Sequence, residues 1–179
     1  FSTAVNKQEA KQEAAFCTEA VKGYKISYPV VYDCEGYDNP SSRMYNVSAQ
    51  ARTDNAIAFL SHIKSAGYDA MIYGAKSDFE NGTYWNMAKI ENDYKVWVAQ
   101  YSATTYPQKQ NPDYNRRYDM WQYTNRGSVK GVSGGCDMIV SYFKASEGQA
   151  VDSSATPDTA PPPKTQEELL YTDTNDQVT

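Results

Sequence analysis

The segment with the clearest chemical potential is a pair of acidic residues that directly follows an apolar run. Residues 28–35 read Tyr-Pro-Val-Val-Tyr-Asp-Cys-Glu, so one residue separates Asp33 from Glu35. Because side chains alternate along a β-strand, we expect both carboxyls on one face, with Cα atoms about 6.5–7 Å apart, and Cys34 on the other face. Paired carboxylates suit cleavage of a glycosidic bond, since one acid donates its proton to the leaving oxygen while its neighbour stays ionised.

Other chemistries for these residue types have less support. An Asp-x-Glu triplet is common and also marks salt-bridged or metal-binding strand ends, where Asp38 could supply a further oxygen ligand. The cysteines Cys17, Cys34 and Cys136 include no C-x-x-C pair and His62 is the only histidine, so we expect neither a metal site nor a Ser-His-Asp hydrolase. We interpret His62 as a helix-surface residue and the cysteines as three buried thiols, with one disulfide plus one free thiol as the alternative.

Aromatic residues accompany the acidic pair in unusual number. The chain has 16 tyrosines and 3 tryptophans, and of these only Tyr171 lies beyond residue 148. Tyr101 and Tyr123 are expected to end strands, as Asp33 does. Aromatic side chains at the mouth of a cleft suit pyranose rings, which present C–H faces and hydroxyl edges. The concentration of aromatic residues at strand ends therefore favours a carbohydrate-binding cleft.

The elements that must position these residues alternate between helix and strand. Asn6 and Glu9 have the spacing of an N-cap pair, and the pattern predicts helices over 6–22 and 48–66 and a further helix within 84–92. Apolar runs predict strands buried on both faces, as in a parallel sheet, in an α/β fold whose catalytic groups lie at the carboxyl ends of the strands. The predicted strands are 29–33, 70–73, 96–101, 120–123 and 138–140.

Charge and composition divide the chain and exclude several partners. The net charge of −5 resides in the C-terminal region, because residues 1–148 are neutral overall. A neutral body argues against nucleic-acid binding, and no apolar run reaches the roughly 20 residues that a membrane span requires. We expect a catalytic domain over 1–148, a Pro/Ser/Thr-rich linker over 149–166, and the start of a further module over 167–179, for which an SH3-like wall-binding module is one candidate. Either an export signal has been removed before Phe1 or the chain starts within a gene.

Four ordered segments carry a more specific resemblance. They are Ser27–Glu35, Val96–Tyr101, Met120–Thr124 and Gly131–Asp137. Together they resemble the glycoside hydrolase family 25 lysozymes (the Chalaropsis-type N-acetylmuramidases) over about residues 1–143. The resemblance implies a (β/α)₈-type, TIM-like barrel without a cofactor. It also implies cleavage of the β-1,4 bond between N-acetylmuramic acid and N-acetylglucosamine in the glycan strands of peptidoglycan.

The resemblance also implies roles for individual residues. Glu35 matches the general acid, Asp33 matches a partner carboxylate that assists the substrate's 2-acetamido group, and Asp137 matches a further acid of the site. The reaction would be retaining, with attack by the acetamido oxygen. Substrate-contacting positions are Tyr101, with Tyr73, Trp97, Trp121 and Gln122 as weaker candidates.

The chain departs from the family pattern at its beginning. Residues 1–4 resemble the end of the third barrel strand, so about two βα units, one of them carrying another active-site Asp, are missing. We therefore expect a partial barrel with an exposed sheet edge, which is either a fragment of a longer sequence or a barrel completed by a separate N-terminal chain. Loss of activity in the isolated piece would follow from the missing N-terminal barrel segment. A non-catalytic cell-wall glycan-binding module is the main alternative, and a chitinase-like hydrolase is a weaker one. The family implies action at the cell wall, by a secreted or phage-encoded protein: an autolysin, a bacteriolysin or an endolysin.

Overall fold

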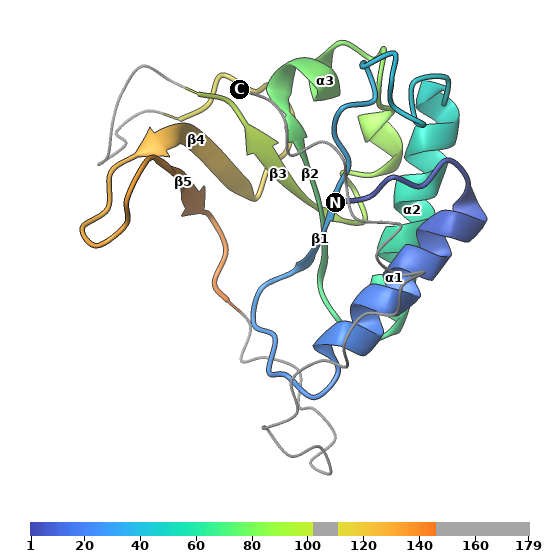
Figure 1. Ribbon diagram of the computed structural model, residues 1–179, viewed down its shortest axis with the longest axis horizontal. Helices are drawn as coiled ribbons and strands as arrows, with labels where there is room; N and C mark the ends of the chain where they lie inside the picture. The colour runs from blue at the N-terminus through green and yellow to red at the C-terminus, as the bar shows by residue number, and fades with distance from the viewer. Residues whose placement is uncertain (102–110, 146–179) are drawn as a thin grey trace.

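The computed structural model describes residues 1–101 and 111–145. In this part of the chain a five-stranded, curled sheet has helices α1 and α2 packed along one side (Figure 1). The elements follow in the order α1 (Lys7–Val21), β1 (Val30–Asp33), α2 (Ala49–Ser65), β2 (Ala70–Ala75), α3 (Lys76–Glu80), η1 (Met87–Lys89), β3 (Lys95–Ala99), β4 (Met120–Gly127) and β5 (Cys136–Ser141). This mixed α/β arrangement is the partial barrel that the sequence predicts.

Strands β1 to β4 are parallel, but β5 is antiparallel to β4. The prediction of a parallel strand buried on both faces over 138–140 is therefore wrong, since β5 is a partly exposed edge strand. The connection 128–135 is shorter than the dozen or so residues that a parallel crossover needs, and it turns with Gly131 and Gly134 at positive φ. Because β5 runs backwards, its first residues lie at the carboxyl edge of the other strands.

The two long helices begin and end where local signals place them. The Asn6 side chain accepts a hydrogen bond from the Glu9 backbone N–H at 2.9 Å, and the Glu9 carboxylate accepts one from the Asn6 side chain at 3.0 Å, so the predicted capping pair is confirmed. The Ser48 hydroxyl caps α2 by accepting from the backbone N–H of Ala51 at 3.2 Å. Gly67 follows α2 with a φ of 91°, which a residue with a side chain rarely adopts.

The helix predicted within 84–92 is reduced to the short 3₁₀ turn η1. Trp85 is only 1% exposed and packs edge-to-face against Tyr32, so this segment enters the core instead of running along the surface. The backbone N–H of Asn86 donates to the Thr53 hydroxyl at 3.0 Å, a bond to α2 in place of one within a helix. Burial of one large aromatic side chain has overridden the local helical pattern.

The core lies between the sheet and the two long helices. One face of the sheet contributes apolar side chains, and α2 adds Leu60 and Ile63, both completely buried. The close packing of α1 on α2 uses small residues, Ala10 and Ala14, which are also completely buried. Full burial of a leucine or isoleucine side chain contributes about 1.5–3 kcal/mol, so this layer holds β1 and β2 in position.

The cysteines, the edge of the sheet and the C-terminal region were each the subject of a prediction. All three cysteines are free thiols, and Cys34 alone is fully buried, with its Sγ 3.5 Å from the Met44 Sδ. The outer edge of β1 receives a backbone hydrogen bond from Ser2 to Asp33 at 2.6 Å. The linker predicted over 149–166 and the module over 167–179 lie outside the described residues. Within the described part, none of the helices is long and apolar enough to cross a membrane.

Candidate active site

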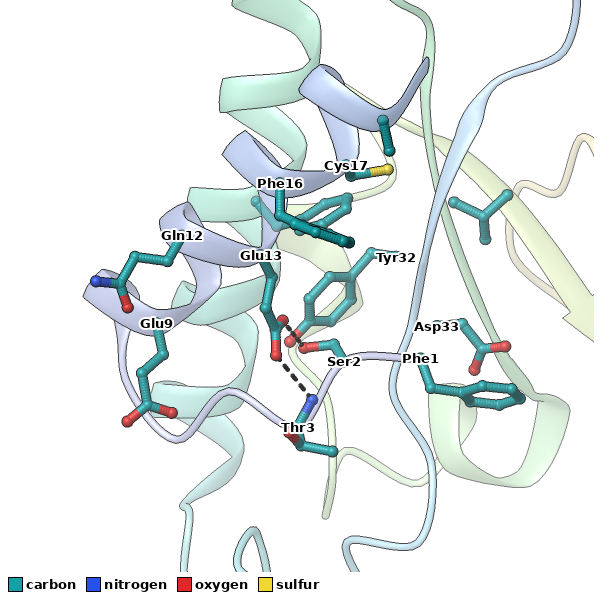
Figure 2. A pocket seen from close by; sticks show the side chains of 13 residues that line it. Phe1, Ser2, Thr3, Glu9, Gln12, Glu13, Phe16, Cys17, Tyr32 and Asp33 are labelled. Atoms are coloured by element: carbon teal, nitrogen blue, oxygen red, sulfur yellow. Dashed lines mark hydrogen bonds between the residues drawn. The ribbon is translucent and has the colours of Figure 1, made fainter. Parts of the chain in front are cut away.

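The side chains of β1 and its extension alternate between the two faces of the sheet. Val30, Tyr32 and Cys34 are buried on the helix side, whereas Asp33 is half-buried and Glu35 is exposed on the other side. Figure 2 shows Tyr32 pointing toward α1 and Asp33 pointing away from it across the strand. The two carboxyls therefore share one face at the carboxyl end of a parallel strand, which is where α/β folds place their catalytic groups.

Asp33 is the more perturbed of the two acids. Its pKa is raised to about 7, chiefly by burial and then by the negative charge of Glu35, while the amino group of Phe1 opposes this rise. Its Oδ1 is buried and finds no hydrogen-bond partner among the described residues. A carboxylate in such surroundings is costly, so Asp33 holds its proton to a much higher pH than an exposed aspartate.

Two acidic residues from other elements act on Glu35. Although the residue as a whole is exposed, partial shielding of its carboxyl group from water raises its pKa. The negative charges of Asp78 and Asp137 raise the pKa further, and the amino group of Phe1 lowers it. Asp137 is the second residue of β5. It lies at the carboxyl edge of the parallel strands because β5 is antiparallel to β4 and begins at this edge.

Aromatic and amide side chains lie beside the acidic cluster. Tyr73 pairs in register with Asp33 on one side and with Trp97 on the other, and the Tyr73 and Trp97 ring centroids are 4.8 Å apart. Gln122 donates from Nε2 to the Tyr101 hydroxyl at 3.3 Å. The pKa of Tyr73 is raised by burial and by the charge of Glu35, and a hydrogen bond with Tyr101 adds to the rise. These four residues are thus brought together with the acids.

Two aromatic residues lie elsewhere than expected. Trp121 points to the helix side of the sheet, is 1% exposed and donates from Nε1 to the Gln100 carbonyl at 2.9 Å, so it is not brought to the acidic cluster. Tyr123 lies within β4 and is also buried, whereas it was expected at a strand end. Tyr101 follows the end of β3 closely and is half-exposed, as expected for a residue at the rim of a cleft.

Asp78 is the residue of this cluster that sequence reasoning missed. It lies in α3, immediately after β2, and its negative charge acts on Glu35. The signal was present in the sequence, because an acid shortly after a parallel strand lies at the same edge as Asp33. Within 1–101 and 111–145, no three His, Cys, Asp or Glu side chains come together to hold a metal ion, and Asp38 is exposed.

A groove of about 530 Å³ runs between α1 and the open edge of β1, with Asp33 on its wall (Figure 2). Apolar side chains line much of it, among them Phe1, Phe16 and Phe59. At its other end the Glu13 carboxylate accepts hydrogen bonds from the Ser2 hydroxyl at 2.6 Å and from the backbone N–H of Thr3. The N-terminal residues are thereby fixed beside β1, where they bury one side of Asp33.

A known family and several solved structures share the fold of this chain. The family model of the glycosyl hydrolases family 25 matches residues 1–132. Among solved structures, the CTP1L endolysin is 26% identical with a TM-score of 0.57, over 79% of this chain and 44% of its own. The bacterial lysozyme from Streptomyces coelicolor is 23% identical with a TM-score of 0.55, over 76% of this chain and 62% of its own.

A third similar structure is the modular Cpl-1 endolysin complexed with a peptidoglycan analogue. It is 23% identical with a TM-score of 0.56, over 80% of this chain and 38% of its own. The chain thus spans less than two thirds of the length of each of these structures. A search of curated proteins found no match.

Proposed function

The chain belongs to the glycosyl hydrolases family 25, and from this premise we propose that it forms part of a peptidoglycan hydrolase. The bond cleaved is the β-1,4 linkage between N-acetylmuramic acid and N-acetylglucosamine. The observation that carries the proposal is the placement of Asp33 and Glu35 on one face at the carboxyl end of β1. There the charge of Glu35 raises the pKa of Asp33, and other acids raise the pKa of Glu35. Similarity to an endolysin and to a bacterial lysozyme supports the same substrate class.

We assign the general-acid role to Glu35. Its side chain is the more exposed of the pair and can reach a leaving-group oxygen, and its raised pKa favours the protonated form that donates the proton. Asp33 lies deeper, and in its ionised form it would hold and polarise the N–H of the substrate's acetamido group. The acetamido oxygen then attacks the anomeric carbon as the glycosidic bond breaks, and the leaving oxygen takes the proton of Glu35. Water next gives a proton back to Glu35 and attacks the anomeric carbon, which opens the cyclic intermediate, so two successive inversions give a retaining reaction.

Asp33 and Glu35 must share a single proton if one is to act as the acid and the other as a carboxylate. Like charges at close range oppose double ionisation, so one carboxyl of the pair stays protonated toward neutral pH. The reaction requires that this proton lies on Glu35 when the glycosidic oxygen arrives beside it. Asp137 would add negative charge that stabilises the positive charge developing on the sugar ring.

Sugar rings would bind against the aromatic and amide residues next to these acids. We propose contacts with Tyr101, Tyr73, Trp97 and Gln122, since all four lie beside the acids at the carboxyl edge. Trp121 is left out of this set because it is buried on the helix side of the sheet. Its packing against Tyr123, with ring centroids 5.7 Å apart, is a sufficient explanation for a tryptophan there. We propose that the protein acts at the cell wall and is either secreted or phage-encoded.

The test uses the full-length protein on purified peptidoglycan. Wild type should clear the wall suspension and release fragments that carry N-acetylmuramic acid at the new reducing end, as read by mass spectrometry. Glu35→Gln should bind walls equally but release roughly 10³-fold less or nothing. Glu19→Gln, which changes an exposed acid on α1, is the matched control and should match wild type. Binding without cleavage by wild type would contradict the enzyme and support a glycan-binding module.

A further inference from the structure

Resting on the proposed role of Glu35, we propose that Asp78 is a positioning residue for that acid. Tyr37 clamps the Asp78 carboxylate in place, and the fixed negative charge keeps the proton on Glu35. Tyr37 follows Glu35 closely in sequence, whereas Asp78 belongs to α3. The two residues are joined by a short hydrogen bond from the Tyr37 hydroxyl to Asp78 Oδ2.

The Tyr37 ring is buried and packs against three neighbouring side chains. It is 4% exposed, and the Arg52 guanidinium carbon lies 4.2 Å from its centroid. The Tyr84 ring packs at 5.0 Å and the Trp85 ring at 5.8 Å between centroids. Trp85 also donates from Nε1 to the Tyr37 hydroxyl oxygen at 3.1 Å. The hydroxyl oxygen accepts the hydrogen bond from Trp85, and the O–H group donates its one hydrogen bond to Asp78.

Arg52, which holds the face of that ring, is itself immobilised. It is 4% exposed and donates to the Tyr84 carbonyl at 3.0 Å and to the Val47 carbonyl at 2.8 Å. A guanidinium over an aromatic ring is attracted to the negative face of the ring, and more strongly when it is buried away from water. The Tyr37 ring is therefore anchored to α2 through Arg52.

The fold brings the clamped carboxylate to the acid pair. β1 and β2 are parallel neighbours with Asp33 beside Tyr73, so the segments that follow both strands emerge at one edge. Asp78 is the third residue of α3, the helix that follows β2 directly, and the Ser77 hydroxyl donates to its second oxygen, Oδ1, at 3.1 Å. After burial, Asp78 is the strongest influence on the pKa of Glu35, ahead of Asp137.

Other charged and titratable groups face Glu35 from the elements around it. Asp137 on β5 acts in the same direction as Asp78, and the amino group of Phe1 acts in the opposite direction. The charge of Glu35 also raises the pKa of Asp33 on β1, of Tyr73 on β2 and of Tyr101 after β3. Asp78 differs from these groups because a hydrogen bond from a buried tyrosine holds its carboxyl group in one position.

The test is a titration of the Glu35 carboxyl by ¹³C NMR in the full-length protein, with the lysis rate followed over the same pH range. Asp78→Asn keeps an oxygen that accepts from Tyr37 but removes the charge. The pKa of Glu35 should fall by about half a unit to one unit. The alkaline limb of the pH–rate profile should move to lower pH by the same amount, and the rate on the acidic side should stay within about twofold of wild type. Asp69→Asn, which precedes β2 at the opposite edge and pairs with Lys95, should move neither.

The outcomes separate this inference from the proposed function. An unchanged Glu35 titration in Asp78→Asn overturns the inference, whether or not the protein lyses walls. A shifted titration in a wild-type protein that never cleaves walls would leave the electrostatic link standing and defeat the proposed function. Equal loss of rate at every pH without a shift would reduce Asp78 to a structural residue and also overturn the inference. If Asp78→Asn fails to fold, Tyr37→Phe replaces it, with a smaller shift expected in the same direction and no shift counting against the inference.

Discussion

Replacing Asp33 with asparagine should make the protein more stable at neutral pH. Asp33 is partly buried beside Glu35, with one carboxyl oxygen that finds no hydrogen-bond partner in the described part of the chain. In the unfolded chain its pKa returns to 3.8, compared with about 7 in the folded protein. Between these values the folded state binds more protons than the unfolded state, so the free energy of unfolding falls as pH rises through the window. Above about pH 7 the free energy of unfolding has fallen by the full amount that Asp33 causes.

The size of this loss follows from the difference between the two pKa values. A difference of about three units corresponds to about 4 kcal/mol at 1.36 kcal/mol per unit. Part of the Asp33 side chain remains in contact with water, which screens its charge, so we reduce the expected effect to about 2 kcal/mol. Asparagine has nearly the same size and cannot ionise, and Asp33→Asn should therefore recover this amount.

The assay is urea unfolding of the full-length wild type and Asp33→Asn at pH 4 and pH 8. The variant should exceed wild type by a few tenths of a kcal/mol at pH 4 and by about 2 kcal/mol at pH 8. Its lytic rate should fall at both pH values, because activity depends on the same carboxylate. A stability difference that is equal at the two pH values, or that favours wild type at pH 8, would refute the reasoning.

Three further predictions concern single side chains. Ser48→Ala removes the cap of α2 and should lower the free energy of unfolding by about 1 kcal/mol in urea titrations, and an unchanged midpoint would contradict the capping role. Leu60→Ala leaves a cavity between α2 and the sheet and should cost about 2–5 kcal/mol in the same assay, while a cost below 1 kcal/mol would place Leu60 outside the core. Tyr101→Ala should lower kcat/KM on soluble peptidoglycan fragments by roughly tenfold through lost sugar contact, with Tyr101→Phe retaining most of the rate, and wild-type kinetics in the alanine variant would remove Tyr101 from the binding surface.

The helices and most strands were predictable because their signals are local. The Asn6–Glu9 pair and the Ser48 cap act within one turn, and Gly67 ends α2 through its own backbone. The direction of β5 could not be inferred from its apolar run, since apolar composition indicates burial and carries no information on pairing. The connection 128–135, with its two glycines at positive φ, was the better signal for a hairpin.

The acid pair was predictable because the alternation of a strand needs only its own sequence. The same rule would have corrected Trp121, because adjacent residues of one strand face opposite sides and Gln122 already faces the acids. The hydrogen bond between Tyr37 and Asp78 was beyond reach, since 41 residues separate them and the pairing of β1 with β2 brings them together. Contacts of that range depend on tertiary structure and leave no periodic pattern in the sequence.

The most direct measurement of the central claim is a crystal structure of the full-length Glu35→Gln protein with a peptidoglycan tetrasaccharide bound. The account predicts that the side chain at position 35 lies about 3 Å from the glycosidic oxygen between N-acetylmuramic acid and N-acetylglucosamine, with Asp33 beside the acetamido group. A glycan bound on another surface, or one whose glycosidic oxygen lies beyond reach of position 35, would contradict it.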